Sequence, residues 1–229
     1  MNRVPASADR QLGSVAELRG VYAVTPDDTD TGSLVRKVRM ALAGGVSAVQ
    51  YRNKPASAAL RRDQGWALLA LCRSERVPLI INDDLDLAEA LGADGVHLGR
   101  EDMPIAAARA RLGRGKLLGA SCYDRLDLAV KACSAGADYV AFGSAFPSLT
   151  KPGATRAPLS LYREAKARLA CPIVAIGGIT SGNAPVVIGA GADAVAVISA
   201  LFDAPDVERS ARQFAGLFSA HDLEKRSAV

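Results

Sequence analysis

The stretch GADGVHL at residues 92–98 recurs in outline as GADYVAF at 136–142 and GADAVAV at 191–197. In each copy a glycine follows a helical pattern, where a left-handed C-cap favours glycine, and a short apolar run begins at once. This pattern is typical of the helix-to-strand turn in a repeated βα unit. The three aspartates lie at strand starts. We interpret them as structural rather than catalytic, because that end of a barrel serves stability.

Short runs that are mostly apolar rather than alternating predict parallel strands covered on both faces. These runs lie at 20–25, 46–51, 78–82, 94–98, 116–121, 138–143, 172–176 and 193–198. Amphipathic stretches predict helices at 31–44, 57–75, 84–91, 104–112, 124–135, 158–169, 180–190 and 206–219. Asp124 and Thr180 are the expected N-caps of two of these helices.

Eight such units without a break in composition predict an α/β fold, a single-domain (β/α)8 TIM barrel over residues 19–220. We expect a flexible lead-in at 1–18 and a C-terminal tail at 221–229. A doubly wound open sheet is the alternative, but it needs a GxGxxG turn after its first strand, and the sequence has none.

Composition narrows the class of protein. A chain of 229 residues that is 49% hydrophobic can bury a full core. The net charge of +4 is mild, and the basic residues are not massed as in a nucleic-acid-binding arm. No apolar stretch approaches the roughly 18 residues that cross a bilayer, and no apolar signal segment opens the chain. We expect a cytoplasmic protein with small anionic partners, without nucleic acid or membrane.

The four cysteines, Cys72, Cys122, Cys133 and Cys171, show no CxxC spacing and have no nearby histidine. A zinc site is therefore not expected. We interpret all four as free thiols of the core, consistent with a reducing compartment.

Charged side chains gather where the predicted strands end. Arg52 and Lys54 follow the second strand two residues apart, so in an extended segment both would face one ligand. Asp83 ends the third strand and Asp102 follows the fourth. Since neighbouring strands lie about 4.8 Å apart, the two carboxylates can share one cation. Oxygen ligands beside a phosphorylated substrate favour Mg²⁺, although helix capping is an alternative role for one acid at each strand end.

The last three strand ends predict sites for anions. The segment 143–151 is long for a βα connection and ends in a cation, so we expect a mobile lid. Gly177-Gly178 after the seventh strand and Ile198-Ser199 after the eighth fit the phosphate-binding corner of many barrels. His97 is interpreted as a hydrogen-bonded structural residue rather than a base.

Seven motifs, taken in their order along the chain, resemble the thiamine-phosphate synthase (thiamine-phosphate pyrophosphorylase) family. They are QYRNK, IINDD, ADGVHLGREDMP, GAS, FGSAFPSLTK, AIGGIT and AVISA. The resemblance extends from Tyr22 to Ala200, and the ordered set is specific although each motif alone is not. It implies a (β/α)8 barrel that joins 4-amino-2-methyl-5-hydroxymethylpyrimidine diphosphate to thiazole phosphate. The products would be thiamine monophosphate and diphosphate.

The resemblance also implies a role for each matching residue. The residues implied for the pyrimidine diphosphate are Gln50 on the pyrimidine side and, on the diphosphate, Arg52, Lys54, Asn82, Ser121 and Lys151. Of these, the implied catalytic residues are Arg52, Lys54, Ser121 and Lys151. The implied Mg²⁺ ligands are Asp83 and Asp102. The residues implied for the thiazole phosphate are Ser148, Leu149, Thr150, Gly178, Ile198 and Ser199.

Two positions depart from the family pattern. Ser144 and Ser148 stand where the lid motif usually has proline and threonine, so we expect altered lid contacts rather than loss of function. The alternatives are a thiazole tautomerase-like isomerase, a non-catalytic phosphate-ligand-binding barrel, and a sugar-phosphate isomerase or epimerase. The tautomerase would use a histidine shortly after the fifth strand, where this chain has Ser121-Cys122-Tyr123. The sequence leaves open whether the chain forms a homodimer.

Overall fold

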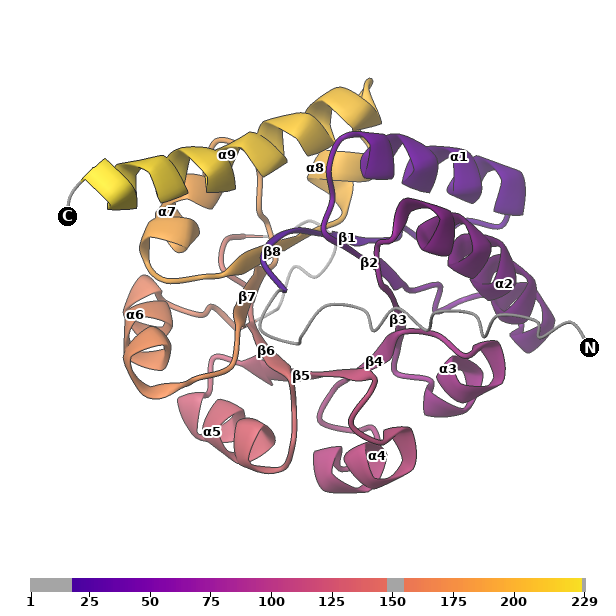
Figure 1. The fold of residues 1–229 in the computed structure, drawn as a ribbon, viewed down its shortest axis with the longest axis horizontal. Helices are drawn as coiled ribbons and strands as arrows, with labels where there is room; N and C mark the ends of the chain where they lie inside the picture. The colour runs from indigo at the N-terminus through magenta and orange to yellow at the C-terminus, as the bar shows by residue number, and fades with distance from the viewer. Residues whose placement is uncertain (1–17, 148–154, 228–229) are drawn as a thin grey trace, which may run out of the picture.

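The computed structural model describes residues 18–147 and 155–227, with side chains described as far as residue 221. Eight parallel strands close into a barrel in chain order, and the helices form a ring around it (Figure 1). The strands are β1 (Gly20–Val24), β2 (Ala48–Tyr51), β3 (Leu79–Asn82), β4 (Gly95–Leu98), β5 (Leu117–Tyr123), β6 (Tyr139–Phe142), β7 (Ile173–Ile176) and β8 (Ala194–Val197). The predicted (β/α)8 barrel is confirmed.

The helices that follow the strands are α1 (Thr31–Ala43), α2 (Ala58–Glu75), α3 (Leu85–Leu91), α4 (Ile105–Leu112), α5 (Leu126–Ser134), α6 (Leu159–Arg168), α7 (Ala184–Gly189), α8 (Ser199–Phe202) and α9 (Val207–Ser227). Helix α9 packs against α1, α7 and α8, so it covers the seam where the first and last strands meet (Figure 1). Within the described residues, no helix is long and apolar enough to span a bilayer.

Three helix boundaries differ from the prediction. Helix α7 begins after Asn183, because Thr180 and Asn183 bond each other in a turn, with Thr180 N–H donating to Asn183 Oδ1 at 2.8 Å. Helix α5 begins after Arg125, so Asp124 is not its N-cap. The short helix α8 directly follows β8, and α9 continues to Ser227, beyond the predicted end at residue 219.

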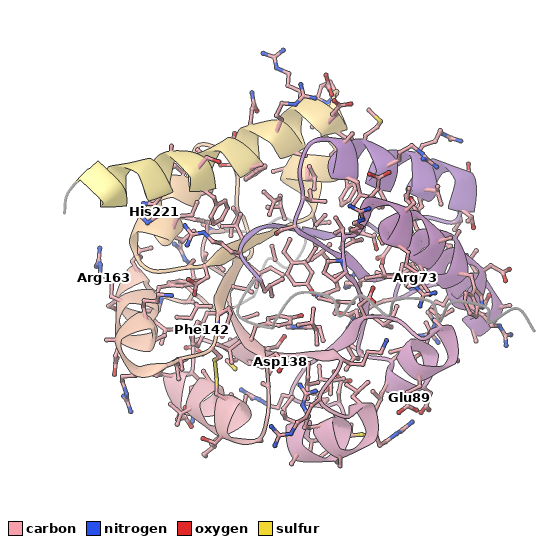
Figure 2. All side chains as sticks on the ribbon, in the orientation of Figure 1. Arg73, Glu89, Asp138, Phe142, Arg163 and His221 are labelled. Atoms are coloured by element: carbon pink, nitrogen blue, oxygen red, sulfur yellow. A yellow bond between two sulfur atoms is a disulfide. The ribbon has the colours of Figure 1, made fainter. Side chains whose placement is uncertain are left out.

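Strand residues alternate between two apolar clusters. One cluster, which includes Tyr22, Ile80 and Val174, fills the interior of the barrel. The other, which includes Val21 and Val49, lies between the strands and the helices. Side chains therefore fill both layers around the strands (Figure 2). With both faces covered, the strands are apolar throughout, as the sequence pattern indicated.

The repeated Gly-Ala-Asp turns have one shared structural role. Asp94 Oδ2 accepts from Leu79 N–H at 2.9 Å, Asp138 Oδ2 from Leu118 N–H at 2.7 Å, and Asp193 Oδ2 from Ile173 N–H at 3.0 Å. Each carboxylate thus pairs with a backbone N–H near the start of the neighbouring strand. The structural interpretation of these aspartates is confirmed.

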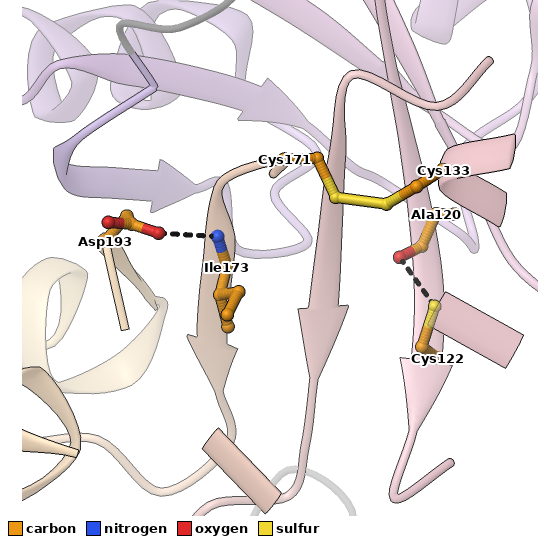
Figure 3. The surroundings of a disulfide bond; sticks show 6 residues. All are labelled: Ala120, Cys122, Cys133, Cys171, Ile173 and Asp193. Atoms are coloured by element: carbon orange, nitrogen blue, oxygen red, sulfur yellow. Dashed lines mark hydrogen bonds between the residues drawn. A yellow bond between two sulfur atoms is a disulfide. The ribbon is translucent and has the colours of Figure 1, made fainter. Parts of the chain in front are cut away.

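The interpretation of all four cysteines as free thiols is wrong for two of them. Cys133 at the end of α5 and Cys171 just before β7 form a disulfide (Figure 3). They are 38 residues apart in sequence and meet because α5 and the start of β7 both flank β6. Cys72 and Cys122 are free and buried, and burial raises the pKa of each thiol to about 12.

Asp94→Ala should lower the free energy of unfolding by about 1–3 kcal/mol, because it leaves the buried Leu79 N–H without its acceptor. Chemical denaturation measures this change. The matched control is Asp86→Ala, which removes an 85% exposed carboxylate paired to Arg111 and should change stability by less than about 0.5 kcal/mol. Equal effects of the two substitutions would contradict the structural role of Asp94.

Candidate active site

The carboxyl ends of the strands surround a cavity of about 770 Å³. Its lining includes many of the residues that the sequence singled out: Gln50, Arg52, Asn82, Ser121, Gly178, Ile198 and Ser199. A smaller recess of about 230 Å³ is lined by Lys54, Asp83 and Asp84 among others. Asn82 lines both spaces, so the recess adjoins the main cavity.

The two cations after β2 are divided between these spaces. Arg52 lines the main cavity, and its Nη1 lies 3.1 Å from Asp27 Oδ1. Lys54 lines the recess, where its Nζ lies 3.2 Å from Asp83 Oδ2. The two spaces adjoin at Asn82, so the expectation that both cations face one ligand stays a prediction.

Asp27 is a site residue that the sequence analysis missed. Its Oδ1 accepts from Arg52 Nη1 and from the backbone N–H of Lys54, both at 3.1 Å. The carboxylate therefore holds the segment after β2 in place and orients the guanidinium. Its signal in the sequence was its position just after the first strand, the end at which the other polar residues had been sought.

The acidic residues after β3 have separate tasks. Asp84 is the N-cap of α3, where its Oδ1 accepts from Leu87 N–H at 2.9 Å. Asp83 has a left-handed backbone with φ 62° and does not cap the helix. The sequence left open which acid of this pair caps the helix, and the structure shows that it is Asp84.

Asp83 and Asp102 lie close enough to interact. Partial burial raises the pKa of Asp102; the hydrogen bond from Gly99 N–H lowers it, and the neighbouring Asp83 carboxylate raises it again. The described residues contain no cluster of three or more His, Cys, Asp or Glu side chains arranged for a metal. Two neighbouring carboxylates fit Mg²⁺, since this ion is held by one or two carboxylates and completes its shell with water and phosphate oxygens.

A row of polar side chains crosses the floor of the cavity. Gln50 Nε2 donates to the Tyr22 hydroxyl at 2.9 Å, and that hydroxyl lies 2.8 Å from the Tyr139 hydroxyl. The Tyr139 hydroxyl lies 3.0 Å from His97 Nδ1, and His97 Nε2 lies 2.9 Å from Ser121 Oγ. His97 is hydrogen-bonded, as interpreted from the sequence, and it is also buried. The sequence analysis assigned no binding or catalytic role to Tyr22 or Tyr139.

Burial lowers the pKa of His97 to about 4, with a smaller opposing effect from Asp83. The imidazole is therefore neutral at physiological pH. It is poorly suited to gain a proton in a reaction near pH 7.

On the opposite side of the mouth, the glycines after β7 allow a close backbone approach. Gly178 has φ 64°, and a Cβ there would lie 2.2 Å from Pro147 O. Phe146 N–H donates to Gly177 O at 3.0 Å, so the loop after β6 lies directly on this turn. Ile198 and Ser199 at the start of α8 complete this side of the cavity.

Part of the expected lid is held by backbone hydrogen bonds. Ser144 N–H donates to Thr155 O at 2.8 Å, and Ala157 N–H donates to Ser144 O at 2.9 Å. The Ser144 hydroxyl donates to Phe146 O. Ser148, Leu149, Thr150 and Lys151 lie outside the described residues, and their roles stay predictions.

A barrel whose strand ends bring Arg52, Lys54 and two adjacent carboxylates to one mouth is typical of enzymes that bind phosphorylated substrates. The family model described as thiamine monophosphate synthase matches residues 21–201. The chain belongs to this family.

Curated relatives agree with the family. Thiamine-phosphate synthase from Methylobacillus flagellatus is 58% identical over 206 residues, which cover 90% of this chain and 98% of the relative. The protein of the same name from Thiobacillus denitrificans is 58% identical over 205 residues, covering 90% and 97%. The solved thiamine phosphate pyrophosphorylase from Pyrococcus furiosus is 35% identical, with a TM-score of 0.81 over 90% of this chain and 98% of that one.

The neutral, buried state of His97 predicts how stability depends on pH. Its folded pKa of about 4 lies below the roughly 6.5 of an unfolded histidine, so between these values the unfolded state binds more protons. This contribution is present above pH 6.5 and is lost as pH falls, by up to about 3 kcal/mol at pH 4. In denaturation measured from pH 7 to 4, His97→Gln should lose less stability than the wild type.

His221→Gln, which changes the chain's other histidine, is the control and should follow the wild type. Parallel pH curves for His97→Gln and the wild type would show that His97 is not buried in its neutral form.

Proposed function

We propose that this chain is a thiamine-phosphate synthase. It joins 4-amino-2-methyl-5-hydroxymethylpyrimidine diphosphate to thiazole phosphate and releases diphosphate. The proposal is supported by membership of the family over residues 21–201 and by relatives of that name at 58% identity. The observation that carries it at the level of the site is the convergence of Arg52, Asn82 and Ser121 on one cavity beside Asp83.

The difficult step is breaking the C–O bond between the pyrimidine methylene carbon and the diphosphate. The diphosphate leaves with the bonding electron pair, and the electron-rich aminopyrimidine stabilises the resulting cationic carbon. The thiazole nitrogen then forms the new C–N bond with its lone pair. This chemistry needs no strong protein base, in agreement with a histidine that is neutral and buried.

The protein's main task is therefore to stabilise negative charge on the leaving group. In this proposal Arg52, which lines the main cavity and bonds Asp27, meets the diphosphate, and Lys54 approaches from the recess. Lys151 has the same role by resemblance. Asp83 and Asp102 are the residues that would hold Mg²⁺, which when bound supplies further charge stabilisation to the diphosphate oxygens.

The second substrate needs a separate anchor. Gly178, Ile198 and Ser199 line the far side of the same cavity, where backbone groups can approach a phosphate closely. We assign them to the thiazole phosphate together with Ser148, Leu149 and Thr150. Anchoring that phosphate holds the thiazole nitrogen near the reacting carbon, which makes the second step effectively intramolecular.

The tautomerase-like isomerase has less support. The end of β5 offers Ser121, Cys122 and Tyr123 in place of its histidine. Of the residues expected for a diphosphate, Arg52, Asn82 and Ser121 line the main cavity. Mg²⁺ as cofactor and a cytoplasmic location are parts of the proposal that rest on the sequence. A homodimer stays an open prediction.

The direct test is to mix the purified protein with both phosphorylated heterocycles and Mg²⁺ and to measure thiamine monophosphate by chromatography. We expect product with wild-type protein and none after chelation of Mg²⁺. Arg52→Ala should lower kcat by about 10²-fold or more, because charge on the leaving group is left unstabilised. Arg62→Ala removes an exposed arginine on α2 and should leave turnover unchanged. Wild-type protein that forms no product would refute the proposal.

Gly178→Ala tests the assignment of the phosphate corner. A Cβ at this position would meet Pro147 O at 2.2 Å, so the turn must shift away from the anion. The KM for thiazole phosphate should rise about tenfold or more, while the KM for the pyrimidine diphosphate changes little. Gly182→Ala is the matched control, because its Cβ would meet only Thr180 Oγ1, at 3.9 Å. An unchanged KM for thiazole phosphate in Gly178→Ala would place the phosphate elsewhere.

A further inference from the structure

Five polar side chains from five different strands form one continuous hydrogen-bonded row across the barrel. The row runs from Gln50 on β2 through Tyr22 on β1, Tyr139 on β6 and His97 on β4 to Ser121 on β5. The family resemblance assigns roles to its two ends, Gln50 and Ser121. The three residues between them have no assigned role.

The middle of the row is tightly packed. Tyr22, Tyr139 and His97 are 1%, 0% and 7% exposed. The Tyr139 ring stacks on His97 with centroids 5.5 Å apart and meets Tyr22 edge-on at 5.9 Å. A Cβ at Gly119 would lie 2.1 Å from Tyr139 Cζ, so glycine is needed there to make room. These rings therefore have little freedom to turn away from their partners.

The donors along this row follow a single direction. The Gln50 amide nitrogen can only donate, so the Tyr22 oxygen accepts from it. The hydrogen bonds of the described residues give the Tyr22 hydroxyl one further partner, Tyr139, to which its own hydrogen must point. Tyr139 then donates to His97 Nδ1, and the His97 hydrogen lies on Nε2 and points at Ser121 Oγ.

The reverse direction would break this pairing. If His97 carried a hydrogen on Nδ1, Tyr139 would accept from it and donate to Tyr22. The Tyr22 oxygen would then accept from both neighbours, and its own hydrogen, on a residue that is 1% exposed, would lose its acceptor. An unpaired buried donor is costly, so the forward direction is favoured.

We infer that Tyr22, Tyr139 and His97 are positioning residues. The two tyrosines fix His97 as the Nε2–H tautomer, and His97 thereby makes Ser121 a hydrogen-bond donor toward the cavity. Ser121 Oγ accepts from His97, which leaves its own hydrogen for a ligand. At the other end, Gln50 uses its amide nitrogen on Tyr22 and keeps its amide oxygen as an acceptor. The inference deepens the proposed function and rests on it for the identity of the ligand.

The two ends of the row thus differ in hydrogen bonding: Ser121 offers a donor to the cavity, and Gln50 offers an acceptor. Gln50 and Ser121 both line the main cavity. A ligand that carries an N–H donor and a separate acceptor atom complements this pair of ends, and an aminopyrimidine diphosphate has both. If the hydrogen bonds of the row lose their fixed direction, alignment of the pyrimidine diphosphate should suffer more than binding of the thiazole phosphate.

The tautomer can be measured directly in the full chain. Long-range ¹H–¹⁵N NMR at neutral pH distinguishes a protonated ring nitrogen from a bare one. The chain has two histidines, so His221→Gln assigns the remaining signals to His97. We expect a protonated Nε2 and a bare Nδ1. A hydrogen on Nδ1, alone or together with one on Nε2, would overturn the inference.

Tyr139→Phe removes the donor to His97 Nδ1 and should convert the single tautomer into a mixture. It should also lower kcat about tenfold or more, with the KM for thiazole phosphate within about twofold of wild type. The matched control is Tyr162→Phe, which removes another buried hydroxyl, one that donates to Phe142 O at 3.0 Å away from the row. This control should keep both the tautomer and kcat.

A Tyr139→Phe variant that keeps the single tautomer, or that keeps wild-type kcat, would contradict the positioning role. If that variant does not fold, the tautomer of the wild type still decides the matter. The NMR measurement uses no substrate. Failure of the synthase assay would therefore refute the proposed function without touching the assignment of the tautomer, and the reverse also holds.

Discussion

Closure of the barrel is the constraint on which the rest of the structure depends. Strand β1 pairs with β8 in parallel register, Val21 opposite Val195 and Tyr22 opposite Ala196. Because every strand runs the same way, closure brings eight carboxyl ends to one mouth. Residues as distant in sequence as Asp27 and Ser199 thereby come to the same end of the molecule. The Gly-Ala-Asp turns hold the opposite end, where each aspartate binds a backbone N–H of the neighbouring strand.

The mouth and the floor of the cavity differ in their electrostatics. At the mouth, ionised groups of both signs stand side by side, with Arg52 against Asp27 and Lys54 against Asp83. These pairs are partly exposed and contribute little to stability, but they hold cations and carboxylates ready for a charged ligand. The floor is made of neutral hydrogen-bonding groups, since burial keeps His97 uncharged. Under the proposed function, the diphosphate and its cation bind at the mouth and the uncharged heterocyclic ring binds at the floor.

Much of this could be predicted from the sequence, because strand ends and glycine turns are local features. The apolar runs before Asp83 and Gly177 located both the strands and the chemistry that follows them. The disulfide between Cys133 and Cys171 could not be predicted, because the two thiols meet only once α5 and β7 pack around β6. The hydrogen-bonded row from Gln50 to Ser121 could not be predicted either, because its residues meet only in the folded barrel.

The arrangement after β2 could not be predicted for a different reason. The alternation of side chains holds within a strand, and β2 ends at Tyr51. The pattern therefore could not show that Arg52 lines the main cavity while Lys54 lines the adjoining recess. Asp27 was not predicted as a site residue because it belongs to no recognisable motif, although its position after the first strand made it a candidate.

The central claim is that one divalent cation and one diphosphate meet where β2, β3 and β4 end. A crystal of the protein grown with Mn²⁺ and inorganic diphosphate tests it most directly, since anomalous scattering locates the metal. We predict one metal peak between Asp83 and Asp102, with the diphosphate in contact with both that metal and Arg52. A metal bound elsewhere, or a diphosphate that touches neither the metal nor Arg52, would contradict the account.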